Sequence, residues 1–284
     1  DNVLLCTGST HALQLLFGCL GTSGTALLPS IGWSYYTTLT RLHGMPVASY
    51  AVAPHGTGFG VDMDSALRAI EAEDPSLVAF INPHMPTGAL TGEDALLLCV
   101  AHARGSLVLV DEAYHGFSRE APTVAPHVLA HDNLVVARTF SKFFGLAGLR
   151  VGYLVAHARI VAELAKALPP FGVPGIAALV ACAALGSEPY YRARADELMA
   201  VKEAFCRRVA ARPRLRLYDS HGNFLLVEFP DAEAAGDAVA RLHQAGVAVR
   251  SARSYGMPAF LRITVGTAET MDLVASLLED AHGA

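Results

Sequence analysis

The sequence contains few lysines, few charged residues and no long apolar run. Charged residues make up 17% of the 284 residues, and only three of the 21 basic residues are lysines: Lys142, Lys166 and Lys202. A reaction that needs a lysine amine therefore has three candidates. Although 52% of the residues are apolar, no stretch reaches the roughly 18 unbroken apolar residues that a membrane helix needs. We therefore expect no membrane partner.

Cysteine, histidine and net charge each argue against one class of site or partner. The five cysteines are odd in number, far apart and set in apolar stretches, which indicates reduced thiols and favours the cytoplasm. The twelve histidines lack the spacing of metal ligands, so we expect no metal. A net charge of −5 and a pI near 6.2 argue against nucleic acid as a partner.

Strand and helix patterns alternate through the first two-thirds of the chain, as in a parallel α/β sheet. After Ala158 the pattern changes to longer helices, followed by two strands, Asn223–Phe229 and Phe260–Val265. We therefore predict an α/β protein with a large domain over residues 1–170 and a small α+β domain over residues 171–284. The predicted strands of the large domain are Val3–Cys6, Thr25–Pro29, Val47–Val52, Leu77–Asn82, Leu107–Asp111, Leu134–Arg138 and Arg150–Val155.

Chemically useful side chains lie at the ends of several predicted strands. Asn82, Asp111 with Tyr114, and Ser141 with Lys142 all occupy such positions. Ligands of open α/β sheets bind at the carboxyl ends of the strands, so these side chains are expected to share one rim. A single aspartate after a strand is more often a helix cap, but the joint occurrence favours a functional site.

A phosphate site is indicated at the start of the first predicted helix. The segment Gly8–Thr10 opens this helix, whose backbone N–H groups and dipole favour an anion. Taken alone, the segment is an ordinary N-cap. Hydroxyls and a guanidinium suited to the same phosphate come from Thr139, Ser141 and Arg150.

The longest motif is TFSKFFGLAGLRVG over Thr139–Gly152, and it resembles the lysine motif of fold type I aminotransferases of the histidinol-phosphate aminotransferase group. Three further segments are similar to motifs of that family, in the same order: Asp111–Tyr114, Asn223–Phe224 and Leu261–Thr267. The resemblance spans Gly8 to Thr267. It implies a large, mostly parallel seven-stranded sheet domain and a smaller C-terminal α+β domain.

The resemblance also implies pyridoxal 5′-phosphate as the cofactor and gives three residues catalytic roles. Lys142 would carry the cofactor, since an apolar pocket beside an arginine lowers the pKa of an amine. Asp111 would pair with the pyridine nitrogen, so that the ring acts as an electron sink, and Tyr114 would donate to the ring hydroxyl. The expected cofactor-binding residues are Gly8, Ser9, Thr10, Trp33, Asn82, Asp111, Tyr114, Thr139, Ser141, Lys142 and Arg150.

Three residues are expected to bind the substrate. By the resemblance, Arg262 would hold the α-carboxylate in a bidentate pair. Arg250 follows a short apolar run and would assist with a second anionic group, although the same position suits a solvent-exposed charge. Asn223 begins the first strand of the small domain. These groups favour a phosphorylated or dicarboxylic amine as the substrate.

Some features depart from the family pattern. The loop Asn82–Gly88 places Met85 where the family has an asparagine that hydrogen-bonds the cofactor, and a thioether is a poor substitute. His84 is the neighbouring side chain that could compensate. The ring that stacks on the cofactor is expected to be Trp33, with Ile31 as the competing alignment. Family members also carry an N-terminal segment that closes the site, and we expect this chain to lack it.

The reaction implied by the resemblance is transamination of an amino acid or a similar amine, with histidinol phosphate as a candidate, to a 2-oxo product. One alternative is another pyridoxal-phosphate reaction on the same fold (elimination, cyclisation or oxidation), which Met85 favours. The other is a catalytically impaired fragment. The expected partners are an amino donor, a 2-oxo acid acceptor and a second copy of the chain in a homodimer.

Overall fold

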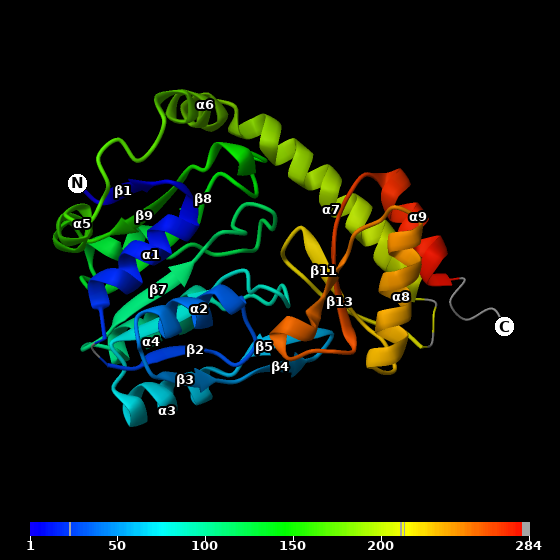
Figure 1. Cartoon of the computed structure of the whole chain (residues 1–284), viewed down its shortest axis with the longest axis horizontal. Helices are drawn as coiled ribbons and strands as arrows, with labels where there is room; N and C mark the ends of the chain where they lie inside the picture. The colour runs from blue at the N-terminus through cyan, green and yellow to red at the C-terminus, as the bar shows by residue number, and fades with distance from the viewer. Residues whose placement is uncertain (23, 211, 213, 280–284) are drawn as a thin grey trace.

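The computed structural model of the chain describes residues 1–22, 24–210, 212 and 214–279. It has two lobes, and the long helix α7 (Glu188–Ala210) runs from one to the other (Figure 1). The large lobe contains a seven-stranded sheet in the order β1-β9-β8-β7-β6-β2-β3. Its strands are β1 (Val3–Cys6), β2 (Ala26–Pro29), β3 (Val47–Tyr50), β6 (Leu77–Ile81), β7 (Leu107–Asp111), β8 (Leu134–Thr139) and β9 (Gly152–Ala156).

This sheet is mostly parallel, which confirms the predicted fold class. Strands β3, β2, β6, β7 and β8 run parallel, whereas β9 pairs antiparallel with both β8 and β1. All residues of β6 are buried, which accounts for its unbroken apolar sequence. Arg150, predicted to begin the last strand, lies in the turn before β9.

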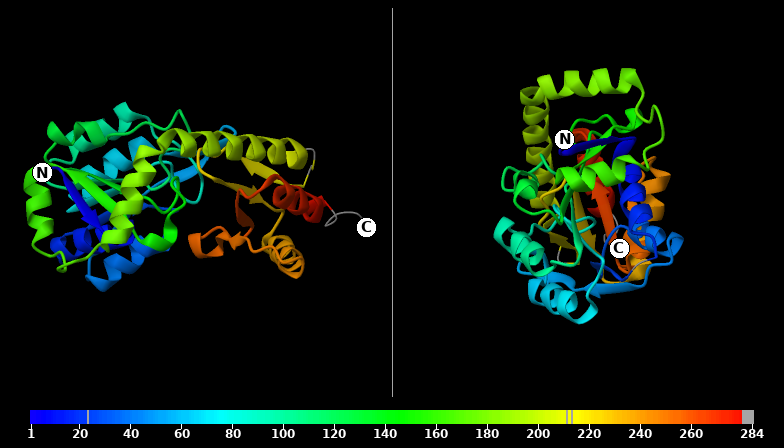
Figure 2. Two further views of the ribbon diagram at one scale, coloured as in Figure 1. Left: turned by 90° about the horizontal axis from the view of Figure 1, so that it is seen from above. Right: turned by 90° about the vertical axis from the view of Figure 1, so that its left-hand side faces the viewer.

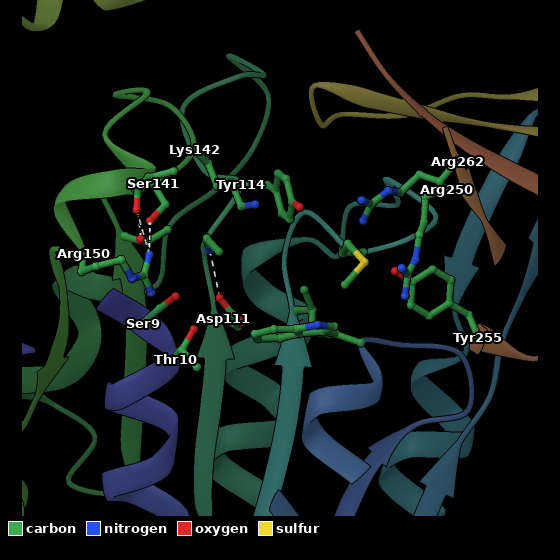
Figure 3. A pocket seen from close by; sticks show the side chains of 16 residues that line it. Ser9, Thr10, Asp111, Tyr114, Ser141, Lys142, Arg150, Arg250, Tyr255 and Arg262 are labelled. Carbon is green, nitrogen blue, oxygen red and sulfur yellow. Dashed lines mark hydrogen bonds between the residues drawn. The ribbon is translucent and has the colours of Figure 1, made fainter. Parts of the chain in front are cut away.

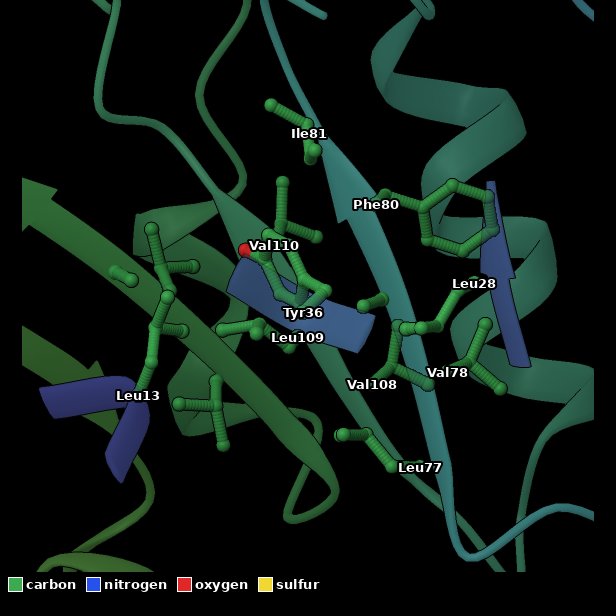
Figure 4. Packing of buried hydrophobic residues seen from close by; sticks show 14 of the residues in the cluster. Leu13, Leu28, Tyr36, Leu77, Val78, Phe80, Ile81, Val108, Leu109 and Val110 are labelled. Carbon is green, nitrogen blue, oxygen red and sulfur yellow. The ribbon is translucent and has the colours of Figure 1, made fainter. Parts of the chain in front are cut away.

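The main hydrophobic core lies between this sheet and its helices. Leu13 and Tyr36 come from two helices and pack with Val108 and other aliphatic residues of the central strands (Figure 4). Because the strands end at the edge of this core, the residues that follow them are held at defined positions. The helices of the large lobe are α1 (Gly8–Leu20), α2 (Ser34–Leu42), α3 (Met63–Glu73), α4 (Glu93–His102), α5 (Ala158–Ala165) and α6 (Gly175–Gly186).

The small lobe has its own antiparallel sheet and its own core. The strand order is β10-β11-β13-β12, and residues of α7 pack with it (Figure 2). The core of this lobe contains Phe205, Leu261 and Leu278. Its elements are β10 (Arg216–Tyr218), β11 (Phe224–Glu228), α8 (Ala232–Gln244), β12 (Arg250–Ser251), η3 (Ala252–Tyr255), β13 (Phe260–Thr264) and α9 (Ala268–Glu279).

The packing of α6 and α7 indicates where the boundary between the two lobes lies. Helix α6 follows the boundary predicted at residue 170, yet its Ala177 and Ala181 pack with Phe140 and Val151 of the large lobe. The second core begins at Phe205, near the end of α7. We therefore propose that the division lies within α7. Residues 280–284 of the predicted small domain lie outside the described residues.

Several helices and strands of the structure were not predicted from the sequence. Helix α2 was not predicted, and the segment Gly56–Gly60, interpreted as a loop, is the turn and second strand of the hairpin β4 (Val52–His55) and β5 (Gly58–Val61). Short strands paired with only one neighbour leave a weak apolar pattern. Among the described residues, no helix is both long and apolar enough to cross a membrane.

Candidate active site

A cavity of about 450 Å³ lies where the carboxyl ends of β6, β7 and β8 meet the small lobe. Figure 3 shows two groups of side chains at its opposite ends. Ser9, Thr10, Ser141 and Arg150 form what we name the hydroxyl end. Arg250, Tyr255 and Arg262 form the arginine end, and Asp111, Tyr114 and Lys142 lie between the two.

The hydroxyl end is built on the first turn of α1. Thr7 is the N-cap but makes no side-chain capping bond, and the first turn contains no acidic residue. Free N–H groups of this turn therefore remain available to an anion. Strand β9 passes so close that a Cβ on Gly152 would lie 2.4 Å from the backbone nitrogen of Ser9. This glycine allows the strand to hold the helix terminus in place.

Arg150 is held at the same end by its backbone and by two acceptors. Its φ of 55° lies in the left-handed region. Its Nη1 donates to Ser141 Oγ at 3.3 Å and to the Ala147 carbonyl at 3.0 Å. A Cβ on Gly8 would lie 2.4 Å from Arg150 Nη2, so the missing side chain makes room for the guanidinium beside α1. The guanidinium of Arg150, the hydroxyl of Ser141 and the N–H groups of α1 thus meet at the hydroxyl end of the cavity.

Asp111 ends β7 and is the buried acid of the cavity, 4% exposed. Tyr36 donates its hydroxyl to Asp111 Oδ2 at 2.8 Å, and the Ala113 N–H donates to Oδ1 at 3.0 Å. Burial raises the pKa of this carboxyl, and the hydrogen bonds from Tyr36 and Ala113 oppose that rise. Two fixed donors therefore orient the carboxylate.

Lys142 extends from the turn that follows β8. Its carbonyl accepts the Gly145 N–H at 3.0 Å, which closes the turn. The amine lies 5.3 Å from the centre of the Tyr114 ring. Desolvation by the surrounding protein lowers the pKa of Lys142, followed by the charges of Arg262 and Arg150, while Asp111 acts in the opposite direction. The side chain still reaches solvent through the cavity, so desolvation is incomplete.

Tyr114 forms one wall beside this lysine. Its ring packs edge-on against Phe224 of the small lobe, with the ring centres 4.9 Å apart. Burial raises the pKa of its hydroxyl, so the group is a neutral hydrogen-bond donor at ordinary pH. The packing joins the two lobes directly behind the centre of the cavity.

The arginine end comes from paired strands of the small lobe. Arg250 of β12 stands opposite Arg262 of β13 in the antiparallel register. Arg250 makes a long contact of 3.5 Å with Ser254 Oγ. The Nε of Arg262 is buried without a hydrogen-bond partner among the described residues. Two cations in facing positions repel each other unless an anion lies between them.

The loop after β6 contributes Met85 and closes on itself. The Asn82 Nδ2 donates to the Thr91 carbonyl at 3.1 Å, and the Thr91 N–H donates to Asn82 Oδ1 at 2.9 Å. These two bonds hold the ends of the loop together. His84 is buried and its Nδ1 lies 2.7 Å from Thr87 Oγ1. Burial lowers the pKa of His84 to about 4. Of these loop residues, Met85 lines the cavity and His84 does not.

The structure brings together most of the residues singled out in the sequence. Trp33 lines the cavity and the competing Ile31 does not. Gly8 lies behind Arg150, and neither Asn82 nor Asn223 belongs to the lining. Sequence analysis assigned no role to four lining residues. Ala113 and Ala147 lie inside recognised motifs but are apolar, and Ile81 and Tyr255 lie outside them.

Comparisons with known proteins identify a matching family and related structures. The sequence model of the family described as aminotransferase class I and II matches residues 1–278. The chain is 35% identical to the histidinol-phosphate aminotransferase of Halobacterium salinarum, over 98% of this chain and 76% of that protein. The histidinol-phosphate aminotransferase of Sinorhizobium meliloti, solved in complex with pyridoxal-5′-phosphate, has a TM-score of 0.89 and 25% identity, over 99% of this chain and 76% of that one.

A third similarity concerns the fold alone. The L-threonine-O-3-phosphate decarboxylase of Porphyromonas gingivalis has a TM-score of 0.86 at 20% identity, and the similarity covers 98% of this chain and 83% of that one. The same architecture therefore occurs in proteins named for different reactions, and the chemistry has to be argued from the side chains of the cavity.

Proposed function

The chain belongs to the aminotransferase class I and II family and is a pyridoxal-phosphate-dependent aminotransferase, and we propose that its amino donor is a phosphorylated primary amine such as histidinol phosphate. The paired arginines of the small lobe carry this proposal. Other residues of the cavity support the assignment of the cofactor.

Features of the cavity fit pyridoxal phosphate. The uncapped first turn of α1, with Arg150 in the space left by Gly8, suits a phosphate group. The buried carboxylate of Asp111 suits a protonated ring nitrogen, since a buried acid needs a cationic or donor partner. The amine of Lys142, whose pKa is lowered by desolvation, suits covalent attachment of the cofactor's aldehyde.

The residues of this chain then divide the chemistry among them. When bound, pyridoxal phosphate supplies an electron sink for the electron pair left at the substrate's α carbon. Lys142 Nζ would accept the proton from that carbon and deliver it to the cofactor, and a lowered pKa leaves more of the amine neutral and able to accept it. Asp111 would hold a proton on the ring nitrogen, and Tyr114 would donate to the ring's oxygen.

The substrate's phosphate is matched by the arginine end. Arg250 and Arg262 stand in facing positions on β12 and β13 and both line the cavity. Their N–H groups are poorly used by the protein, since one contact is 3.5 Å long and the Nε of Arg262 has no partner among the described residues. A phosphate dianion balances two guanidinium groups better than a single carboxylate does.

A substrate series tests this proposal. We expect kcat/KM for histidinol phosphate to exceed that for histidinol, which lacks the phosphate, by about 100-fold, because charge-assisted hydrogen bonds contribute about 3 kcal/mol in total. Arg250→Ala should reduce that ratio by about tenfold. Equal values for the two compounds, or higher values for amino acids without a phosphate, would refute the substrate class.

The control is Arg253→Ala. Arg253 is exposed, lies in η3 next to the arginine end and does not line the cavity. It should leave the ratio unchanged. If it lowers the ratio as much as Arg250→Ala, the effect comes from overall positive charge rather than from a phosphate site.

The proposal includes a homodimer located in the cytoplasm. Helix α6 exposes Ile176, Leu179 and Leu185 to solvent, and the preceding Phe171 is fully exposed. A second copy of the chain would cover these apolar side chains. The five cysteines are all unpaired, which is consistent with a reducing compartment. Light scattering at micromolar concentration should give a dimer, and Leu179→Glu should shift it toward monomer.

A further inference from the structure

We propose that Tyr36 is a positioning residue for Asp111, whose hydroxyl fixes one carboxylate oxygen and keeps the acid ionised and directed at the cofactor's ring nitrogen. This inference rests on the proposed cofactor site. Tyr36 is absent from the motifs found in the sequence, and it does not line the cavity that contains Asp111.

The two side chains form a buried hydrogen-bonded pair. Tyr36 is 2% exposed and Asp111 is 4% exposed, and the hydroxyl donates to Oδ2 at 2.8 Å. The Ala113 N–H donates to Oδ1 at 3.0 Å, so each oxygen has one protein donor. A carboxylate oxygen accepts more than one hydrogen bond, and Asp111 lines the cavity. The remaining acceptor capacity therefore faces the ligand.

The tyrosine ring is clamped, so its hydroxyl cannot turn elsewhere. The ring of Tyr36 packs against Phe17 of α1 and edge-on against Trp33, with 6.2 Å between ring centres in both cases. Figure 4 shows it embedded among the aliphatic residues of the sheet. Trp33 in turn lines the cavity. One aromatic cluster thus places both the cavity wall and the donor to Asp111.

The charge balance around Asp111 explains why it needs this donor. Burial is the largest influence and raises the pKa of Asp111, and Glu112 raises it further. The Tyr36 hydroxyl lowers it, as do the Ala113 N–H and the cationic Lys142. Tyr36 itself has a pKa raised well above its usual value, first by burial and then by Asp111, so it remains a neutral donor. Without it, the neutral acid would be a poorer partner for a ring nitrogen that must stay protonated.

Tyr36→Phe tests the pair because it removes the hydroxyl and keeps the ring. In the cofactor-free protein, with carboxyl-labelled aspartate assigned by comparison with Asp111→Asn, carbon NMR should give a pKa of Asp111 raised by about one unit or more. Pyridoxal phosphate should bind about tenfold more weakly, measured by quenching of Trp33, the single tryptophan of the chain.

Tyr50→Phe is the matched control. Tyr50 is 1% exposed and donates its hydroxyl to the Ala79 carbonyl at 2.8 Å, so its loss removes a comparable buried hydrogen bond that does not reach Asp111. It should leave the pKa of Asp111 and the cofactor affinity unchanged. If Tyr36→Phe fails to fold, fluorotyrosine in the otherwise unchanged protein provides a stronger donor and should lower the pKa of Asp111.

The outcomes separate this inference from the proposed function. If the parent protein does not bind pyridoxal phosphate, the proposed site is wrong. If the parent binds it, while Tyr36→Phe shifts neither the pKa of Asp111 nor the affinity, or Tyr50→Phe shifts both equally, the role of Tyr36 is overturned.

Discussion

The two ends of the cavity present their cationic groups in different ways. At the hydroxyl end, Arg150 is already bound to Ser141 and to the Ala147 carbonyl, and the backbone of α1 supplies further donors. At the arginine end, Arg250 and Arg262 face each other with few protein acceptors. The first end belongs to the large lobe and the second to the small lobe.

Under the proposed function, this difference separates a site for a permanent ligand from a site for an exchanging one. Donors fixed by backbone and by existing hydrogen bonds are preorganised and lose little entropy on binding. Guanidinium groups without acceptors gain most when a charged ligand arrives and can be adapted to different ligands. We therefore expect substitutions at the hydroxyl end to change cofactor affinity and those at the arginine end to change substrate preference.

The largest expected effect lies between the two ends, at Lys142. Lys142→Ala should lower kcat by about 10⁴-fold, because proton transfer at the α carbon loses its base. The visible absorption band of the lysine-linked cofactor should also disappear. Lys166→Ala serves as control, since Lys166 is exposed and paired with Glu163. Borohydride reduction that fixes the cofactor on Lys166 or Lys202 would contradict the assignment.

Asp111→Asn comes next. It replaces the only charge on this side chain while keeping its shape, and the ring nitrogen should lose its proton. Single-turnover rates should fall by about 10³-fold, or about 4 kcal/mol, while the cofactor still binds through the hydroxyl end. Asp196→Asn removes an exposed partner of Arg119 and should change nothing. Rates within a factor of a few of the parent would argue against the role of Asp111.

Gly8→Ala sharpens the comparison at the hydroxyl end. Its φ of 79° disfavours alanine, and the new Cβ would push Arg150 away from α1. We expect cofactor affinity to fall by about 10- to 100-fold, with an unchanged preference for phosphorylated substrates. Gly21→Ala, at the other end of α1, has a φ of 62°, and among the described residues no atom beyond its chain neighbours lies within 4 Å of the new Cβ. If both variants weaken binding equally, helix strain rather than Arg150 is responsible.

The smallest expected effect concerns Met85, between the ends. Met85→Asn adds an amide donor to the wall that Tyr114 shares. A second donor to the ring's oxygen stabilises its anion, and the nitrogen that joins Lys142 to the cofactor then binds its proton less tightly. The pKa read from the visible band should fall by about one unit, equivalent to about 1.4 kcal/mol.

Met85→Leu is the control for that variant, because it removes the sulfur without adding a donor, and the pKa should not move. If Met85→Asn leaves the pKa unchanged, the loop does not approach the ring. If it lowers the pKa but suppresses the native reaction, Met85 is an adaptation to chemistry other than transamination.

Much of the fold is visible in the sequence because buried parallel strands have nearly continuous apolar sequences. Strands β6, β7 and β8 were predicted in this way. Helix α2 was not, since SYYTTLTRL mixes aromatic and hydroxyl residues and has no side-chain cap. Its helical state comes from packing of Tyr36 and Leu39 into the core. Tertiary packing overrides weak local preference at this point.

The candidate site shows the same division between residues that local sequence reveals and residues that only tertiary packing reveals. Lys142, Asp111 and Arg150 were identified because each follows or precedes a strand within a motif. Tyr36 was not, because its partner is far away in the chain: Asp111 lies 75 positions from it. Asn82 is the reverse case. The sequence predicted that it contacts the cofactor, whereas in the structure its side-chain amide bonds to the backbone of Thr91.

The sequence by itself determined the local features of this protein: one lysine in a recognisable motif, an acid after a predicted strand, and the segment Gly8–Thr10 at the start of a helix. These features are local, and a few adjacent residues are enough to specify them. Only the tertiary structure decided which arginines face each other, which of Trp33 and Ile31 reaches the cavity, and which hydroxyl supports Asp111. Those relations join segments that are distant in sequence, and they depend on the packing of one element against another.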